Sequence, residues 1–165
     1  VAELLGFRQM FACICLSVCA PTRKDLSEWL LDRAFDEERK HVIAALKDIP
    51  LVALVSDGWS NLRRESLINF IIVAPGIRPL LWTCRVTAEA VKSGTYMAQM
   101  IGDVVDEIEK EIGVVKVVSV TTDNASNMRS AWSILEQTCP GFLATGCAAH
   151  GLRLLMKDVL GFDIL

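Results

Sequence analysis

The sequence predicts a mixed α/β fold, in which a three-stranded antiparallel meander is followed by strands that helical crossovers add in parallel. Two observations carry this prediction. Short apolar runs rich in Val, Leu and Ile, typical of buried strands, occur at 51–56, 67–74, 79–86, 114–122 and 142–145. Short turn segments link the first three runs, whereas helical patterns precede the last two. A strand that follows a helical crossover lies parallel to its neighbour, so the fourth run can lie beside the first.

The composition indicates one folded domain and excludes some functions. The chain has 165 residues, of which 52% are hydrophobic and 22% charged, which is typical of a globular protein. Its net charge of −3 argues against a free-standing nucleic-acid binder, which is normally basic. It still allows an enzyme that contacts nucleic acid locally.

The six cysteines do not form the pattern of a small disulfide-stapled protein. We therefore expect a reducing, intracellular compartment, either nuclear or cytoplasmic. The apolar stretch 10–20 is shorter than the roughly 20 residues that span a bilayer, so we expect no membrane contact. A signal-peptide core is the weaker alternative, because no basic segment precedes it.

The N-terminal region up to Pro50 divides into a flank and a helical region. We interpret 1–20 as a hydrophobic flank, and 21–165 as one partial catalytic-type domain. The first residue is Val and not Met, so we expect a piece of a longer product or a gene model with a missing start. Thr22 and Asp25 have the spacing of a helix-capping box, and apolar residues at helical spacing continue to position 49. This region is one long surface helix or two shorter ones.

The central elements follow from periodicity and turn residues. The strand 51–56 ends at a turn signal, Asp57-Gly58, and a polar turn is expected at 61–65. The region 93–112 is a clear amphipathic helix that ends at Gly113. Helices are also predicted at 124–138 and 147–159, the latter with an apolar side formed by Leu152, Leu155, Met156 and Val159. Three tryptophans lie in apolar patterns and are expected in the core: Trp29, Trp82 and Trp132.

Two aspartates directly follow predicted central strands. Asp57 ends the first strand and Asp123 ends the fourth. If the two strands are neighbours, these carboxylates meet at one edge of the sheet, and their mutual repulsion calls for a cation. Mg²⁺ or Mn²⁺ suits such oxygen ligands, and a pair of ions supports phosphodiester displacement. The alternative is structural: Asp57 opens a turn and Asp123 belongs to a helix N-cap.

Cys147 and His150 form a C-x2-H motif at the start of the last predicted helix. Cys139 could add a third ligand, but a structural zinc site needs about four, so zinc is not expected. Two interpretations stay open. Either Cys147 is packed and His150 projects from the first helical turn, or His150 contacts substrate near the metal site.

Several motifs together resemble one protein family. They are PTRK (21–24) with LLDRA (30–34), LVSDGWSN (54–61), NFIIV (69–73), TDNASNM (122–128) and GCAAHGLRLLMKDV (146–159). In this order, the chain resembles the hAT superfamily of cut-and-paste DNA transposases over about residues 21–160. The similar part is a domain of unknown function at the front of their catalytic region.

The resemblance implies an RNase H-like fold, here incomplete, with a metal-dependent Asp-Asp-Glu site. Asp57 matches the first family carboxylate and Asp123 the second, while Cys147 and His150 match a motif that helps to handle DNA. Glu136 and Asp158 come too early to match the third carboxylate. The resemblance also implies DNA as the partner of the full-length protein, with oligomerisation through a C-terminal region.

Three hypotheses about function follow. The first is a hAT-type catalytic-core fragment that is inactive alone, so whether this chain is itself an enzyme stays undecided. The second is a domesticated module that binds protein or DNA without catalysis. The third, weaker reading is an unrelated metal-dependent phosphoester hydrolase.

Overall fold

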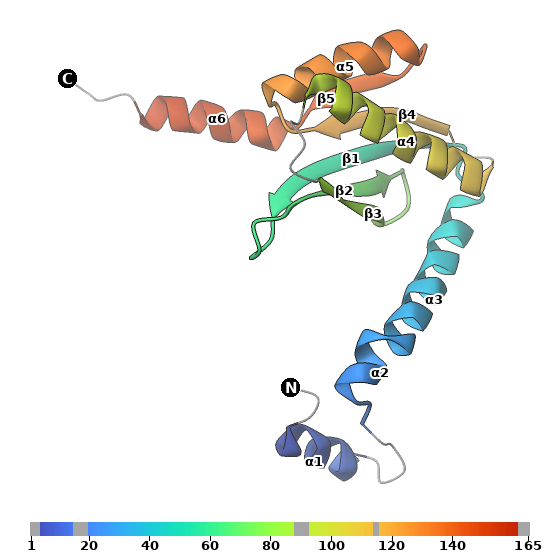
Figure 1. Cartoon of the computed structure of the whole chain (residues 1–165). Helices are drawn as coiled ribbons and strands as arrows, with labels where there is room; N and C mark the ends of the chain where they lie inside the picture. Colours follow the sequence, from blue (N-terminus) through green and yellow to red (C-terminus); the bar gives the residue numbers. More distant parts are fainter. Residues whose placement is uncertain (1–3, 15–19, 88–92, 114–115, 162–165) are drawn as a thin grey trace. The chain divides into compact units, whose positions relative to one another are not determined.

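The structure is a computed structural model that describes residues 4–14, 20–87, 93–113 and 116–161. Residues 1–44 and 45–165 form two compact units, and each is described by itself (Figure 1). The first unit holds α1 (Leu5–Ile14), α2 (Arg23–Ser27) and most of α3 (Trp29–Leu46). The predicted boundary at residue 20 stays a prediction.

The predicted capping box is present at the start of α2. The Thr22 hydroxyl accepts from the Asp25 backbone N–H at 3.2 Å, and the Asp25 carboxylate accepts from the Thr22 hydroxyl and backbone N–H at 2.6 and 2.9 Å. These bonds, the hydroxyl bond first, hold the pKa of Asp25 below its ordinary value. The helix stops at Glu28, whose dihedral angles leave the helical region (φ −114°, ψ −111°). The region therefore forms two helices. The prediction that Trp29 lies in the core is wrong: Trp29 is the first residue of α3, and its side chain is exposed.

The second unit is built on a five-stranded mixed sheet in the order β3-β2-β1-β4-β5. Its strands are β1 (Leu51–Ser60), β2 (Ser66–Val73), β3 (Leu80–Thr87), β4 (Lys116–Thr122) and β5 (Leu143–Gly146). β1, β2 and β3 pair antiparallel, whereas β4 pairs parallel with β1 and β5 parallel with β4. The sheet confirms the predicted meander with parallel additions, and the arrangement is RNase H-like.

The first strand is longer than predicted. Asp57-Gly58 does not turn the chain, because Asp57 is paired with Asn69 and the ladder continues to Ser60 opposite Ser66. The turn lies at 61–65, where the Asn61 side chain accepts from the backbone N–H groups of Arg63 and Glu65. Cross-strand pairing with β2 overrides the turn preference of an Asp-Gly pair.

Helices α4 (Gly94–Ile112) and α5 (Ser126–Thr138) lie on one side of the sheet (Figure 1). Alternate residues of β1 face them, and Val52, Leu54 and Ser56 are buried. Trp82 is also buried and Trp132 half-buried, as their apolar patterns indicate. Ser93 caps α4 at its start, and Gly113 ends it in the left-handed region with φ 77°.

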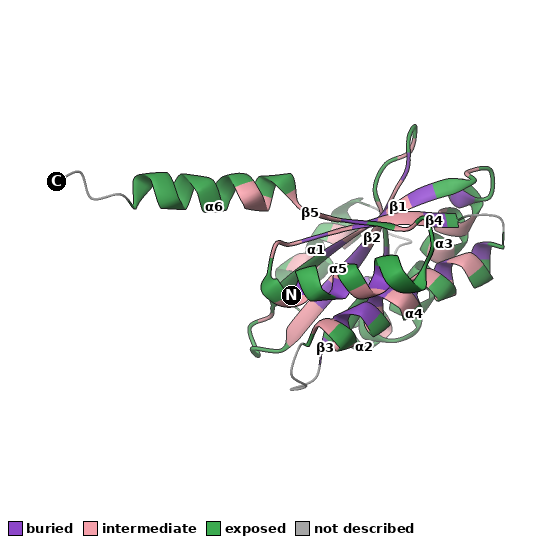
Figure 2. Cartoon of the chain, turned by 90° about the horizontal axis from the view of Figure 1, so that it is seen from above, coloured by how far each residue is buried: buried purple, intermediate pink, exposed green. Residues whose placement is uncertain are grey.

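The last helix, α6 (Ala148–Leu160), begins and ends within one residue of the predicted positions. None of its residues is buried (Figure 2). Leu152, Leu155, Met156 and Val159 are amphipathically spaced but 54–62% exposed. The spacing agrees with the predicted apolar side, and that side is largely exposed within the described part of the chain. Among all the residues that the structure describes, no helix is long and apolar enough to cross a bilayer.

Candidate metal and phosphoester site

The parallel strands β1, β4 and β5 bring their carboxyl ends to the same edge of the sheet. The last paired positions are Val55 with Thr121 between β1 and β4, and Thr122 with Gly146 between β4 and β5. Ligands of α/β sheets commonly bind beyond the carboxyl ends of parallel strands. This edge of the sheet carries the predicted site residues.

Asp57 and Asp123 each lie two residues beyond the Val55–Thr121 pair. Asp57 belongs to the face of β1 opposite the buried Ser56, whereas β4 ends at Thr122 and Asp123 lies in the segment that leads to α5. Each aspartate also directly follows a buried residue, Ser56 or Thr122. The register thus puts the two aspartates, 66 residues apart in sequence, at the same end of the neighbouring strands β1 and β4.

The two carboxylates differ in their surroundings. Asp57 is exposed on β1, and its side chain makes no hydrogen bond or ion pair with the described residues. Asp123 is half-buried, and its Oδ1 accepts from the Ala125 backbone N–H at 3.0 Å. Ala125 is the N-cap of α5 and has no capping side chain of its own. Asp123 Oδ1 therefore closes a turn just before α5 and does not cap the helix, so the N-cap alternative for Asp123 is wrong, while Oδ2 makes no bond within the described chain.

A cavity of about 200 Å³ borders Asp123 on the helix-covered side. Gly58 and Ser60 of β1, Met97 of α4 and the start of α5 around Asn127 line it. The amino-terminal end of a helix favours anions, because its first backbone N–H groups lack intrahelical acceptors. The cavity thus offers room, a hydroxyl and a helix start beside one of the two carboxylates.

Cys147 and His150 lie at the same edge. Cys147 is the single residue between β5 and α6, and its backbone N–H donates to the Thr122 carbonyl oxygen at 2.7 Å. His150 is half-exposed in the first turn of α6. Both interpretations of the motif are compatible with this placement: Cys147 is partly packed, and His150 projects from the first turn near the Asp123 end of β4.

Sequence reasoning missed the polar residues that support Asp123. The Trp132 indole N–H donates to the Thr122 hydroxyl at 3.0 Å, and that hydroxyl donates to the Asp123 carbonyl oxygen at 2.8 Å. The Asn124 amide donates to the Cys147 carbonyl oxygen at 3.1 Å. The TDNASNM motif contains Thr122 and Asn124, but only the tertiary structure shows what they contact.

The donor set suits a hard divalent cation in part. Within the described residues, no group of three or more His, Cys, Asp or Glu side chains is placed to hold a metal ion. Two carboxylates with an oxygen each to spare match Mg²⁺ or Mn²⁺, which keep several water ligands. Cys139 is exposed and lies at the C-terminal end of α5.

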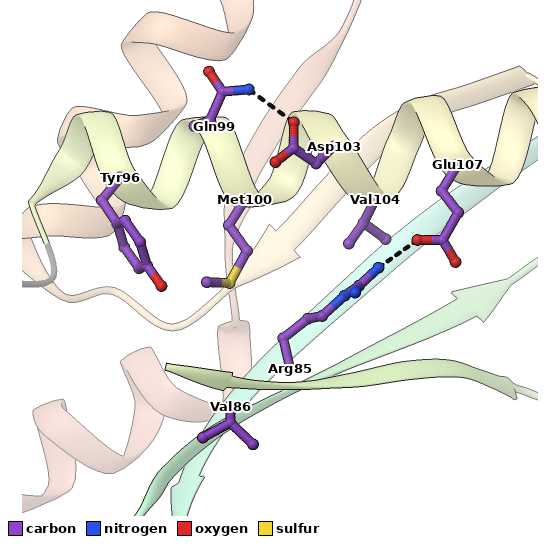
Figure 3. A pocket seen from close by; sticks show the side chains of 8 residues that line it. All are labelled: Arg85, Val86, Tyr96, Gln99, Met100, Asp103, Val104 and Glu107. Carbon is purple, nitrogen blue, oxygen red and sulfur yellow. Dashed lines mark hydrogen bonds and ion pairs between the residues drawn. The ribbon is translucent and has the colours of Figure 1, made fainter. Parts of the chain in front are cut away.

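A second cavity, of about 300 Å³, lies between α4 and the edge strand β3 (Figure 3). Arg85 reaches from β3 to an ion pair with Glu107, and Gln99 donates to Asp103 at 2.7 Å along α4. Tyr96 and Met100 complete its wall. None of the predicted site residues lines this cavity.

The family model described as a domain of unknown function (DUF659) matches residues 21–165. The comparison with curated proteins finds no match.

Proposed function

The chain belongs to the DUF659 family, and on this premise we propose that it is the front part of a hAT-type DNA transposase catalytic core. The family is associated with hAT-type transposase-like proteins. The proposed reaction is metal-dependent cleavage and transfer of DNA phosphodiesters, and the proposed compartment is the nucleus. The chain on its own is proposed to be inactive.

The register of β1 and β4 is the observation that carries this proposal. It gives Asp57 and Asp123 the same displacement from one paired position. Strands 4.8 Å apart can place two carboxylates around one cation with metal–oxygen bonds of about 2.0–2.6 Å. An arrangement in which β4 lay at the far side of the sheet would have left the two aspartates without a common role.

Each residue at the edge has a proposed part in the chemistry. Asp57 and the Oδ2 atom of Asp123 would hold Mg²⁺ or Mn²⁺. When bound, such ions stabilise the attacking and leaving oxygens of a phosphodiester. Ser60 and the start of α5 would bind a phosphate oxygen in the adjoining cavity. His150 would contact the DNA backbone beside it.

Neither remaining acidic candidate supplies the third carboxylate that the resemblance implies. Glu136 lies ten residues along α5 from Ser126, about 15 Å from the site at the usual helical rise, and its side chain accepts from the Ala144 backbone N–H at 3.2 Å. Asp158 lies eight residues along α6 from His150, about 12 Å away. We propose that this carboxylate comes from sequence outside these 165 residues.

One observation favours the alternative of a non-catalytic interaction module. The apolar side of α6 is exposed, which is typical of a surface that binds another protein segment. Such a module would still bind its partner when Asp57 and Asp123 are replaced, whereas the catalytic function requires both carboxylates.

The proposal is tested by Mn²⁺ binding, measured by electron paramagnetic resonance of the free ion. The variants are Asp57→Asn and Asp123→Asn, which keep shape and remove charge; the amide oxygen at position 123 can still accept from Ala125. The matched control is Asp106→Asn, an exposed position on α4. We expect either site variant to weaken Mn²⁺ binding at least tenfold and the control to leave it unchanged. Equal binding by all four proteins would refute a shared metal site.

A further inference from the structure

The junction between β5 and α6 is unusually short and is held by residues next to Asp123. β5 ends at Gly146 and α6 begins at Ala148, so Cys147 alone joins them, whereas such connections commonly take 2–6 residues. The Cys147 backbone N–H donates to the Thr122 carbonyl oxygen at 2.7 Å, and its carbonyl oxygen accepts from the Asn124 amide at 3.1 Å. Both polar backbone groups of the junction therefore bind residues that flank Asp123.

Asn124 also fits between two glycines of the junction. A Cβ atom on Gly146 would lie 1.7 Å from Asn124 Oδ1 and 2.9 Å from its Cγ. A Cβ atom on Gly151 would lie 3.5 Å from Asn124 Nδ2. The amide thus occupies the space that a side chain at 146 would fill, and a Cβ atom at 151 would be in ordinary van der Waals contact with it.

This contact matters because the rest of α6 has little else to fix its start. No residue of α6 is buried, so apolar packing does not orient the helix within the described chain. The Cys147 carbonyl oxygen also accepts from the Gly151 backbone N–H at 3.0 Å, which closes the first turn. The same oxygen therefore joins the Asn124 amide to the turn that carries His150.

We propose that Asn124 is a positioning residue that holds the Cys147–His150 turn beside Asp123 and so presents His150 to a phosphate at the metal edge. The inference rests on the proposed function for the role of His150, but the contact itself does not. Asn124 acts through the Cys147 carbonyl oxygen and touches neither metal nor phosphate. Its amide is required as a donor, because a carboxylate there would face the carbonyl oxygen without a proton to share.

Two substitutions separate the shape of Asn124 from its hydrogen bond. Asn124→Leu keeps a branched side chain of similar size and removes the donor, whereas Asn124→Ala removes both. Gln137→Ala is the matched control, an exposed amide at the other end of α5. The chain has two histidines, so a His41→Gln variant assigns the imidazole proton signals of His150 in the NMR spectrum.

The measurements are the paramagnetic broadening of the His150 imidazole signals by Mn²⁺ and the hydrogen exchange of residues 148–151. In the wild type we expect strong broadening by bound Mn²⁺. In both Asn124 variants we expect clearly weaker broadening at equal Mn²⁺ occupancy, and exchange about fivefold faster, as for the loss of one hydrogen bond. The control should match the wild type.

The outcomes distinguish this inference from the proposed function. Unchanged broadening and exchange in Asn124→Leu would overturn the positioning role, whatever the alanine variant does. If wild-type protein binds no Mn²⁺, the proposed function fails, and exchange at 148–151 still decides whether Asn124 fixes the turn. If Mn²⁺ binds and exchange responds but His150 is never broadened, Asn124 holds the turn without serving the metal edge, and the inference is refuted.

Discussion

Replacing Gly146 with alanine should destabilise the second unit. The new Cβ would lie 1.7 Å from Asn124 Oδ1 and 3.0 Å from Trp132 Cη2, so Asn124 must leave its place. Overpacking typically costs about 1–3 kcal/mol, and the lost bond from Asn124 to Cys147 adds about 1 kcal/mol. We therefore expect the free energy of unfolding to fall by about 2–4 kcal/mol.

Urea unfolding followed by circular dichroism measures this loss. Gly102→Ala is the matched control, because the same methyl group there would meet no atom within 4 Å and alanine suits a helix interior better by about 1 kcal/mol. The double variant Gly146→Ala with Asn124→Ala should be less unstable than the sum of the single changes, because the clash partner is gone. If Gly146→Ala unfolds at the wild-type urea midpoint, the described contact between Asn124 and the junction is wrong.

Three further predictions concern the core, a helix end and pH. Phe70→Ala should lower the free energy of unfolding by about 3–5 kcal/mol, because Phe70 is fully buried, whereas Leu62→Ala at the exposed hairpin tip should leave the urea midpoint unchanged. Gly113→Ala should cost about 1–2 kcal/mol in the same assay, because φ is 77° at this helix end; no loss would contradict the left-handed cap. Thr22→Ala should raise the pKa of Asp25 toward its ordinary value in an NMR titration. Since that pKa is lowered in the folded state, its stabilising contribution is present above the ordinary carboxyl pKa and disappears as the pH falls through the folded value; an unchanged titration in the variant would exclude the capping box as the cause.

Periodicity was a reliable guide wherever one face of an element is buried. The helix from Gly94 to Ile112 and its end at Gly113 agree with the prediction within a residue. The strands also appear where apolar runs predicted them, and the parallel addition beside β1 is confirmed. Burial imposes a period on the sequence, and that period can be read without coordinates.

Local turn preference was a weaker guide. Asp57-Gly58 was predicted to turn the chain but lies inside β1, because the partner strand β2 satisfies its backbone groups. Trp29 was expected in the core on spacing alone and is exposed. The apolar side of α6 shows the same limit: amphipathic spacing indicates that a helix has an apolar face but does not say what covers that face.

The candidate site was predictable as a list of residues and not as an arrangement. Asp57, Asp123, Cys147 and His150 were identified from strand ends and motifs, whereas the supporting contacts of Thr122, Asn124 and Trp132 were not. Side-chain hydrogen bonds between residues 10 and 23 positions apart leave no periodic trace in the sequence. Whether the two aspartates share a cation stays a prediction.

The amino-acid sequence by itself determined the kinds of elements, their order and the positions of two acids near the ends of central strands. Hydrophobic periodicity and turn-forming residues, which indicate these features, are local properties of the chain. Only the tertiary structure decided that β4 pairs with β1 in a register that ends at Val55 and Thr121, each two residues before an aspartate, and that Asn124 fills the space left by Gly146. Strand order, register and close packing depend on contacts between distant segments, which form only when the whole sheet is assembled.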